Sequence, residues 1–583
     1  MSEPPRLPRS PTLSRSLVLE RTWPFFLDLS VAACGLALFY AVLRIAQYWM
    51  GHPVPAIAIS PSAKMLPLYA FYSVVRIFVA YLLSLLFAVG YGYIAAYNPR
   101  AEAFMIAVLD ILQSIPVLSF LPAVMLAMVS LIPGRQLGIE MGAILLIFTG
   151  QVWNLAFSFY SSLKSLPREL REDANVFRFT AWQRFWQLEL PYSAIGLVWN
   201  SMVSVAGGWF FLMACEMFIL GNRDLRLPGL GSYLQTAANA GDTRAIVWGL
   251  SVMIGIIVLI DQLIWRPVIA WSEKFKFEQV ESVESPHSFV LDFLQRSKIL
   301  PFLARVAVRP VREYLSLYFA NRQVAAGENR KPGAIGKWIS RVLLGAMLTG
   351  VAYAFVKMII LLVGLTRAEL HGIFVGAGAT LLRVAFTLVL AGLWTIPVGV
   401  IVGLKPKLSA IAQPLAQIAA SVPATALFPI ILLVLIKAGG GLGIGAIVLL
   451  LLGTQWYILF NVIAGAMAIP TDLKEVCNVF RFNKLERWRE LYLPGIFPYL
   501  VTGFVTASGG AWNASIIAEY FRFKGHTYTV TGLGSVISDA TDTGNYRVLM
   551  GATILMAMMV VTINRLLWRR LYALAATRFK LEG

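Results

Sequence analysis

The stretch that decides the fold occurs twice: residues 170–191 read LREDANVFRFTAWQRFWQLELP, and residues 473–494 read LKEVCNVFRFNKLERWRELYLP. At this offset of 303 residues, 11 of 22 positions are identical. Both copies are polar and amphipathic, and each follows a long apolar stretch. Such self-similarity at a long, fixed period indicates an internal duplication.

The duplication extends outward from these two segments through both halves of the chain. A Gly-Leu-Gly motif follows each copy, preceded each time by a glutamate within an apolar stretch. Upstream, a Ser-x-Pro motif recurs at an offset of 307. The aligned positions are Arg76 with Arg383, Ser114-Ile115-Pro116 with Ser421-Val422-Pro423, Glu216 with Glu519, and Gly229-Leu230-Gly231 with Gly532-Leu533-Gly534.

The composition excludes a soluble protein. Of 583 residues, 58% are hydrophobic and 14% charged, and the mean hydropathy is +0.71. An apolar helix of about 20 residues can cross a bilayer because it satisfies its own backbone hydrogen bonds. Twelve stretches qualify: 24–47, 66–93, 104–132, 138–162, 192–220, 245–270, 341–364, 373–403, 409–436, 441–465, 495–519 and 548–570.

These stretches predict an all-α, polytopic membrane protein with about 12 transmembrane helices. Six spans per half is an even number, so the two six-helix repeats run parallel, and a pathway is expected between them. The predicted units are a cytoplasmic N-terminal tail (1–23), a first domain (24–270), a cytoplasmic linker (271–340) and a second domain (341–583). Within the linker, 287–320 is amphipathic and is predicted to lie on the inner leaflet.

The net charge of +19 is an orientation signal. With the N-terminus inside, roughly 35 of the 49 Lys and Arg residues fall on the cytoplasmic side, as the positive-inside rule requires. Both termini are therefore predicted to be cytoplasmic, and the basic excess does not indicate a nucleic-acid partner.

The sequence lacks the motifs of an enzyme. Its Gly336-Lys337 pair is followed by Trp338, so it does not form a phosphate-binding P-loop. The three cysteines and four histidines are scattered without metal-ligand spacing. We therefore predict neither a catalytic site nor a metal site.

The duplicated segment resembles the EAA coupling loop of ABC-importer permeases. Glu172-Asp173-Ala174 and Glu475-Val476-Cys477 occupy its first positions, and Leu-Pro closes each copy at 190–191 and 493–494. The Ser-x-Pro motif and the Gly-Leu-Gly after a glutamate narrow the resemblance to the nitrate, sulfonate, taurine and bicarbonate branch. It implies the transmembrane domain of a type I ABC importer in a bacterial inner membrane, with two permease units fused in one chain.

The resemblance also implies partners. Two copies of an ATPase subunit would bind ATP and Mg²⁺, so this chain itself is expected to hold no cofactor. A periplasmic substrate-binding protein is a further expected partner, and membrane lipid surrounds the chain. The coupling residues that the resemblance assigns are Glu172, Asp173, Ala174, Phe177, Arg178, Glu475, Val476, Phe480 and Arg481.

Two features depart from the family pattern. Arg178 and Arg481 stand where the family has glycine, which would permit a left-handed corner between two short helices. Either the corner is built differently, or the helix runs on and the arginine pairs with the partner. The second short helix is expected around 181–188 and 484–491. The other departure is a long outward connection of thirteen residues from each glutamate to Gly-Leu-Gly, which puts the docking of a binding protein in question.

Polar side chains on helices expected to face the interface between the repeats are the candidates for substrate contact. Ordinary interhelical hydrogen bonding is the alternative for each of them, and a gate or a structural bond is equally consistent with the two glutamates. The candidates are Gln113, Ser114, Gln151, Asn154, Asn200, Ser204, Glu216, Ser421, Gln455, Thr506, Ser508, Asn513 and Glu519.

The sequence therefore predicts the permease subunit of an ATP-driven importer, with ATP hydrolysis on a separate chain. The resemblance favours a small anion of the nitrate, sulfonate, taurine or bicarbonate type as substrate. The alternatives are a fused permease for ferric iron or a thiamine-type cofactor, an ATP-independent secondary carrier, and a membrane sensor that uses the same fold.

Overall fold

The computed structural model describes residues 59–133, 136–220, 223–275, 334–437, 441–523 and 526–578, with four further single positions between 310 and 318. The predicted first span, 24–47, and the amphipathic linker segment, apart from those positions, lie outside the described residues. Helices reach into the predicted linker from both sides, as far as Phe275 and from Ala334 onward.

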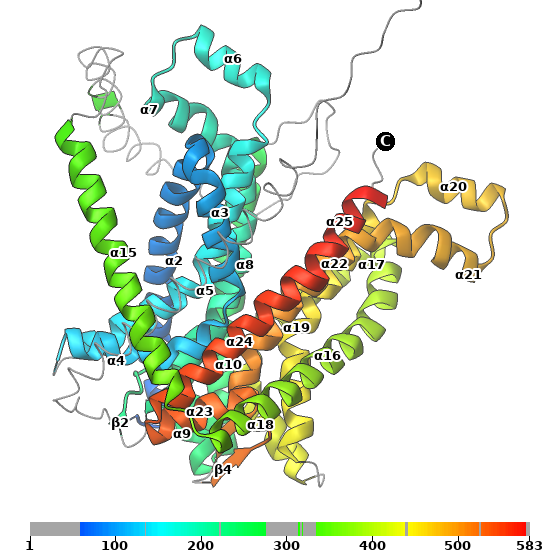
Figure 1. Ribbon diagram of the computed structural model, residues 1–583. Coiled ribbons are helices and arrows are strands. Elements are labelled where there is room, and N and C mark those ends of the chain that lie inside the picture. The colour runs from blue at the N-terminus through cyan, green and yellow to red at the C-terminus, as the bar shows by residue number, and fades with distance from the viewer. Residues whose placement is uncertain are drawn as a thin grey trace, which may run out of the picture.

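The described chain is almost entirely helical (Figure 1). The first half contains α2 (Leu66–Tyr97), α3 (Pro99–Ser114), α4 (Leu121–Leu131), α5 (Gln136–Lys164), α6 (Arg168–Val176), α7 (Ala181–Arg184), α8 (Leu190–Glu216), α9 (Leu230–Ala240), α10 (Thr243–Ile260) and α11 (Arg266–Ser272). The second half contains α15 (Ala334–Val363), α16 (Arg367–Gly403), α17 (Pro406–Ser421), α18 (Ala424–Lys437), α19 (Leu442–Met467), α20 (Thr471–Val479), α21 (Lys484–Glu486), α22 (Leu493–Ala518), α23 (Leu533–Thr543), α24 (Tyr546–Ile563) and α25 (Arg569–Arg578).

Eight of the described helices are long and apolar enough to cross a membrane, or nine if one bent pair forms a single span. This confirms an all-α, polytopic architecture, although the described residues contain fewer such helices than the twelve predicted from sequence. The chain is thus a multi-pass membrane protein.

The predicted span 104–132 is not one helix. Its two parts, α3 and α4, are bent by 83° around Ile115 and Pro116, whose backbones are extended. In the second half α17 ends at Ser421 and α18 begins at Ala424, with Val422 extended before Pro423. A residue before proline is driven from the helical region by the proline ring, which explains both breaks.

The two halves are built alike. α5 packs between α2 and α8, and α19 packs between α16 and α22. Trp209 and Trp512, which are equivalent in the duplication, are both buried in the hydrophobic core.

The halves also interlock. α8 of the first half contacts α17 and α18 of the second, and α22 contacts the turn Val117–Phe120 that precedes α4. α24 contacts α3, and α10 contacts α17. The broken pair α17 and α18 therefore lies against α8 of the first half, and the turn between α3 and α4 lies against α22 of the second half.

Four π turns interrupt the long helices at equivalent places: Phe185–Glu189, Asp261–Trp265, Arg487–Tyr492 and Asn564–Trp568. Leu190 N donates to Phe185 O, five residues back, and Leu493 N donates to Trp488 O in the same way. Pro191 and Pro494 follow directly. Because a proline cannot donate a hydrogen bond and crowds the preceding turn, the wider π turn lets the helix continue past it.

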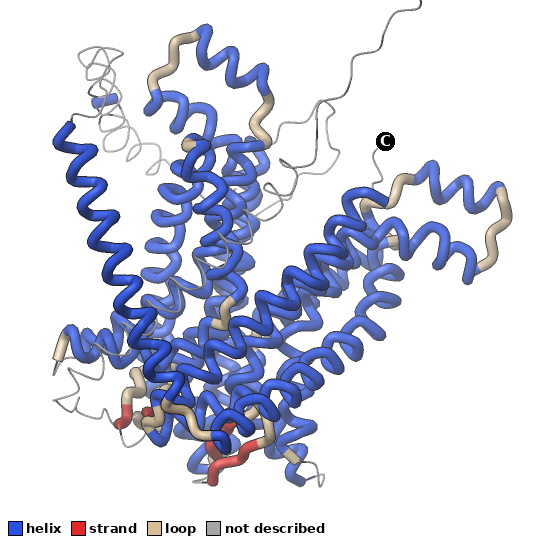
Figure 2. The backbone as a smooth tube through the Cα atoms, viewed as in Figure 1, coloured by secondary structure: helices blue, strands red, loops and turns tan. Residues whose placement is uncertain are grey.

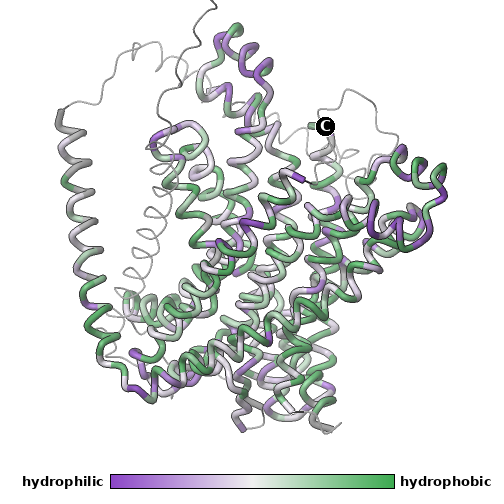
Figure 3. The backbone as a smooth tube through the Cα atoms, turned by 45° about the vertical axis from the view of Figure 1, so that its right-hand side comes forward, coloured by the Kyte–Doolittle hydropathy of each residue, from purple (hydrophilic) through white to green (hydrophobic). Residues whose placement is uncertain are grey.

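The molecule has two distinct ends. The loops that contain α6 with α7 and α20 with α21 project from one end, called the loop end (Figures 1 and 2). Two antiparallel hairpins lie at the opposite end, called the hairpin end: β1 (Ile219–Leu220) with β2 (Arg223–Asp224), and β3 (Tyr520–Phe523) with β4 (His526–Thr529). Hydrophilic residues gather in the projecting loops, and hydrophobic residues dominate the helices between the two ends (Figure 3).

Candidate functional site

Both loops at the loop end turn the same left-handed corner. Arg178 and Arg481 each have φ of 51°, and they are the non-glycine residues with positive φ in the described chain. Phe179 N donates to Ala174 O at 2.9 Å, and Arg178 N to Asn175 O at 3.0 Å. These two bonds form a Schellman motif, in which the left-handed residue directly follows the helix cap.

The sequence-based expectation for this corner was wrong. Arg178 and Arg481 adopt the left-handed conformation that glycine would adopt at this position, and the short helices before them end at Val176 and Val479. A left-handed conformation costs a residue with a Cβ about 1–2 kcal/mol. The hydrogen bonds on both sides of the corner offset this cost: Thr180 and Gln183 form a capping box that begins α7, and Asn483 with Glu486 forms the same box in the second half.

The corners expose apolar side chains. Val176 and Phe177 are 77% and 72% exposed, and Val479 and Phe480 are 77% and 70% exposed. Ala174 lies buried beneath the first corner. The other predicted coupling residues are exposed: Glu172, Asp173, Arg178, Glu475, Val476 and Arg481. Each loop therefore presents an apolar knob beside acidic side chains.

The predicted second short helix is wrong. The helix that begins at Ala181 continues through a π turn and Pro191 to Glu216, a run of 36 residues. In the second half it runs for 35 residues, from Lys484 to Ala518. The Leu-Pro motif lies inside a continuous helix, so each loop is attached directly to a membrane helix.

The first loop has an anchor that sequence reasoning missed. Glu189 is fully buried; its Oε1 accepts a hydrogen bond from Tyr97 Oη at 2.5 Å and lies 2.8 Å from Arg184 Nε. In the duplication, Tyr492 stands at the position of Glu189. Because the residue types differ between the halves, self-comparison gave no signal for this anchor.

At the hairpin end, the two aligned glutamates close matching buried clusters. Glu216 Oε1 accepts from Ser73 Oγ at 2.7 Å and Arg76 Nη1 at 2.8 Å, and Glu216 Oε2 accepts from Gly231 N at 2.7 Å. Arg76 Nη1 also donates to Pro228 O at 2.8 Å. We call this group of side chains the latch, because it ties the connection before α9 to the end of α8.

The second half repeats the latch. Glu519 accepts from Thr380 Oγ1 at 2.8 Å, from Gly534 N at 2.7 Å and from Arg383 Nη1. One difference separates the two: Arg76 is also paired with Glu140 of α5 at 2.6 Å. A Cβ on Gly229 or Gly532 would lie 2.3 or 2.1 Å from the glutamate carboxylate. The latch thus explains why glycine stands at these positions.

The long connections between glutamate and Gly-Leu-Gly form the two hairpins. In the first, Arg226 Nε donates to Asp224 Oδ1 at 2.8 Å, and Arg226 Nη1 donates to Thr236 Oγ1 of α9 at 3.2 Å. Burial raises the pKa of the Asp224 carboxyl, but the hydrogen bonds from Arg226 outweigh it and hold the pKa below its ordinary value. The hairpins also reach across the molecule, since β1 contacts α23 and β3 contacts α9.

The other predicted pathway residues are dispersed along the bundle. Asn200 Nδ2 donates to Ser158 Oγ at 3.1 Å, which is an interhelical bond within one half. Asn513 Oδ1 accepts from Leu118 N of the other half at 3.4 Å. Gln151 and Ser204 are buried, and no partner for their side-chain polar atoms lies within the described residues. Gln455 and Ser508 are also buried, Asn154 is half-buried, and Gln113 and Thr506 are exposed; the side chains of Ser114 and Ser421 lie outside the described set.

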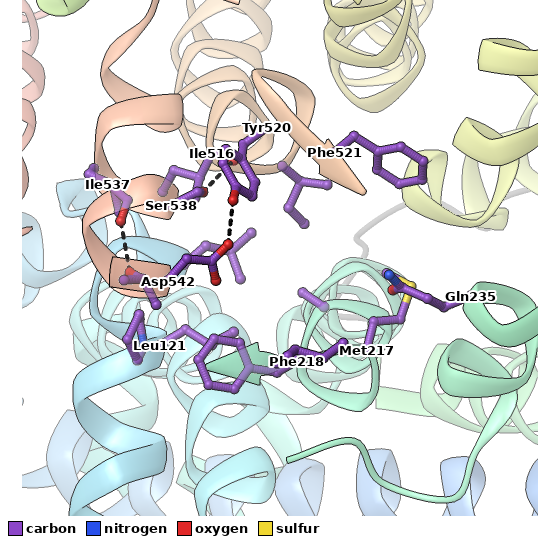
Figure 4. A pocket seen from close by; sticks show the side chains of 16 residues that line it. Leu121, Met217, Phe218, Gln235, Ile516, Tyr520, Phe521, Ile537, Ser538 and Asp542 are labelled. Carbon is purple, nitrogen blue, oxygen red and sulfur yellow. Dashed lines mark hydrogen bonds between the residues drawn. The ribbon is translucent and has the colours of Figure 1, made fainter. Parts of the chain in front are cut away.

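A cavity of about 160 Å³ lies between the halves at the hairpin end (Figure 4). Its walls come from α4 and the turn before it, the ends of α8 and α22, β1, β3, α9 and α23. None of the thirteen predicted pathway residues lines it. The polar lining residues are Gln235, Tyr520, Ser538, Thr541 and Asp542. No sequence motif joins these residues, and their proximity comes from the packing of the two halves.

The fold and these duplicated sites define a membrane transport protein made of two permease units. A family model described as "Binding-protein-dependent transport system inner membrane component" matches residues 88–264 and again residues 395–580. The chain belongs to this family and carries two copies of its domain in one polypeptide.

Similar curated proteins are transport permeases. A nitrate import permease of Leptolyngbya laminosa is 27% identical over 196 residues, which are 34% of this chain and 67% of that protein. A bicarbonate transport system permease of Synechococcus elongatus is 32% identical over 169 residues, or 29% of this chain and 58% of that protein. A taurine transport system permease of Escherichia coli is 25% identical over 165 residues, or 28% of this chain and 55% of that protein. The matched region thus spans little more than half of the last two relatives.

Proposed function

We propose that this chain forms the whole translocation pathway of an ATP-driven ABC importer, with one pseudo-dimeric pathway between its two halves. The observation that carries this proposal is the pair of loops. Both have the same left-handed corner, the same exposed Val-Phe knob and the same direct attachment to a membrane helix. Two matching docking elements at one end suit two copies of one ATPase subunit.

The orientation follows from charge. The loop end carries the basic segments that the positive-inside rule assigns to the cytoplasm, so the loops face the compartment that contains ATP. We place the chain in a bacterial inner membrane with both termini cytoplasmic. The chain itself would be a transport subunit without catalytic activity, and ATP and Mg²⁺ would bind the ATPase subunits.

The substrate proposed is a small anion of the nitrate, bicarbonate or sulfonate type. The substrates in the names of the relatives support this class. The family description also supports a substrate-binding protein as partner, which would meet the hairpin end.

Co-purification tests the coupling role. Glu172→Lys with Glu475→Lys reverses two exposed charges, one on each loop, and is expected to abolish co-purification of the ATPase subunit and ATP-driven uptake. The matched control is Arg100→Glu with Lys407→Glu. These two exposed residues are equivalent in the duplication and lie at the start of α3 and α17, outside the loops.

The control should leave both readouts near those of the unmodified chain. Undiminished co-purification and uptake in the loop variant would overturn the proposed coupling. Uptake that persists without the ATPase and collapses with the ion gradient would instead identify a secondary carrier.

A further inference from the structure

The two projecting loops share a corner and an apolar knob, but they are joined to their halves differently (Figure 1). The first loop contains α6 and α7, and polar side chains tie its base to the neighbouring helices. The second loop contains α20 and α21, and residues of other types stand at the positions equivalent to those anchors. The duplication makes the comparison possible, because each position has a counterpart in the other half.

An ion pair holds the entry to the first loop. Glu102 Oε1 of α3 lies 2.7 Å from Lys164 Nζ at the end of α5, and it also accepts a hydrogen bond from Tyr160 Oη at 2.6 Å. α6 begins shortly after Lys164, at Arg168. The chain that enters the first loop is therefore held against α3.

Further hydrogen bonds surround the base of the first loop. Arg171 Nη2 donates to Leu163 O at 2.6 Å, which joins α6 back to the end of α5. Tyr192 Oη, beyond the loop, donates to Ser165 O at 3.1 Å. The buried Glu189 fixes the exit from the loop to α2. Both the entry and the exit thus have directional contacts.

The second half replaces these anchors. At offsets of 307 and 303, Ser409 stands at the position of Glu102 and Met467 at that of Lys164. Ser409 Oγ and Gln413 Nε2 lie 3.7 and 3.4 Å from the Met467 sulfur, which is a weak acceptor. The residues equivalent to Tyr97, Tyr160, Arg171, Glu189 and Tyr192 are Leu404, Ile463, Lys474, Tyr492 and Gly495.

Apolar packing holds the second loop instead. Cys477 and Leu491 are buried, and Phe482 and Trp488 pack against the hydrophobic core. Apolar burial has no preferred direction, whereas a hydrogen bond or an ion pair orients the groups that it joins. We therefore expect the second loop to tilt more freely about its attachment than the first.

This difference matters for docking because the exposed knobs match. Val176 and Phe177 in the first loop are exposed to the same extent as Val479 and Phe480 in the second. A docking element that is already held in one orientation loses less freedom when its partner binds. Two loops with the same knob but different bases should therefore bind the same partner with different affinity.

We propose that the first loop is the primary docking site for the ATPase subunit and that the second loop is a weaker, more compliant site. This inference rests on the proposed import function and ranks two surfaces that share one knob. A chain with one ATPase subunit bound would hold it on the first loop. The anchored base is expected to give the first loop about tenfold higher affinity.

Two single-loop variants test the ranking. Phe177→Asp disables the first knob and Phe480→Asp the equivalent second knob; both side chains are exposed, so neither change is expected to disturb the core. The ATPase subunit that co-purifies with the chain is removed and titrated back onto each full-length variant without nucleotide. Phe480→Asp, which keeps the first loop, is expected to bind it with a Kd about tenfold lower than Phe177→Asp.

An exchange of anchor residues tests the cause. Glu102→Ser with Lys164→Met gives the first half the residues of the second at these positions, and in the Phe480→Asp chain it should raise the Kd by about fivefold or more. The matched control is the same exchange in the Phe177→Asp chain, whose remaining loop belongs to the other half, and its Kd should not change. Asp173, which has no acidic counterpart in the second loop, stays unchanged, so the exchange tests the base alone.

Equal affinities of the two single-loop variants, or tighter binding to the second loop, overturn the inference and leave the import function standing. An exchange that leaves the Kd unchanged in the Phe480→Asp chain, or raises it equally in the control, overturns it as well. Unimpaired binding when both phenylalanines are changed together overturns the proposed coupling too. Where an aspartate variant does not fold, Phe177→Ala and Phe480→Ala make the same comparison.

Discussion

The two latches are nearly identical in geometry but differ in charge. This difference predicts that the glutamate variants and the arginine variants rank the two halves in opposite order of stability. Arg76 is paired with two carboxylates, Glu216 and Glu140, whereas Arg383 is paired with Glu519 alone among the described residues. Removing the latch glutamate should therefore lower the free energy of unfolding more in the second half. Removing the latch arginine should lower it more in the first half.

The magnitudes follow from what each change leaves behind. Glu519→Gln leaves Arg383, whose side chain is 12% exposed, without a carboxylate, which costs about 3–5 kcal/mol of folding free energy. Glu216→Gln leaves Arg76 bound to Glu140 by two hydrogen bonds, so the loss is one charge-assisted bond, about 1.5–3 kcal/mol. The expected difference is about 2 kcal/mol.

The arginine variants reverse this order. Arg76→Met leaves two neighbouring carboxylates, one of them fully buried, whereas Arg383→Met leaves one. Like charges without a counterion repel each other in addition to their desolvation cost. Arg76→Met is therefore expected to be the more destabilising of the two.

The assay is the thermal unfolding midpoint of the purified full chain in detergent. A difference of about 2 kcal/mol corresponds to about 4–8 °C for a unit of 150–250 residues. Ser73→Ala and Thr380→Val serve as matched controls, since each removes the hydroxyl that donates to the glutamate and accepts from the backbone N–H of Leu230 or Leu533, without changing charge, and their shifts should agree. The reasoning is refuted if Glu216→Gln unfolds at or below the midpoint temperature of Glu519→Gln, or if Arg383→Met unfolds at a lower temperature than Arg76→Met. Either result would show that Glu140 does not distinguish the two latches.

The other predictions concern the left-handed corners, the glycine beside the latch glutamate of the second half, and the buried Glu189. Arg178→Gly with Arg481→Gly should relieve about 1–2 kcal/mol of backbone strain per site and raise the unfolding midpoint; lost ATPase co-purification in this stabilised variant would show that the arginine side chains themselves are needed. Gly532→Ala should lower the midpoint, because its Cβ would lie 2.1 Å from the latch carboxylate, whereas Gly509→Ala, with open space around it, should not; equal shifts would contradict the close approach. Glu189→Gln should lower ATPase stimulation through the first loop while the chain still assembles, and unchanged stimulation would show that the anchor is only structural.

Much of the fold was predictable because it depends on local composition. Length and hydropathy indicated the long helices, and self-comparison indicated two similar halves. The break between α3 and α4 was missed because 104–132 is mostly apolar and long enough to be interpreted as one span, although Pro116 carried the signal. The continuous helix through Pro191 was missed because proline was interpreted as a terminator, and the π turn that accommodates it has no sequence signature.

The functional sites were predictable only in part. Self-comparison aligned Arg76 with Arg383 and Glu216 with Glu519, but the contact between arginine and glutamate joins residues 140 positions apart and required the fold. The cavity residues come from both halves and share no motif. Asp542 in particular gave no signal, because its equivalent position holds Asn239.

The unbroken helices from Ala181 to Glu216 and from Lys484 to Ala518 make each half a lever. At 1.5 Å per residue, the first is a rod of about 54 Å, with the exposed corner next to one end and the latch at the other. Tilting such a rod by about 5° moves one end relative to the other by about 5 Å, which is roughly one helical turn. Because the tips of both levers form walls of the cavity, a force applied at the loops would change the width of that cavity without any helix having to unwind.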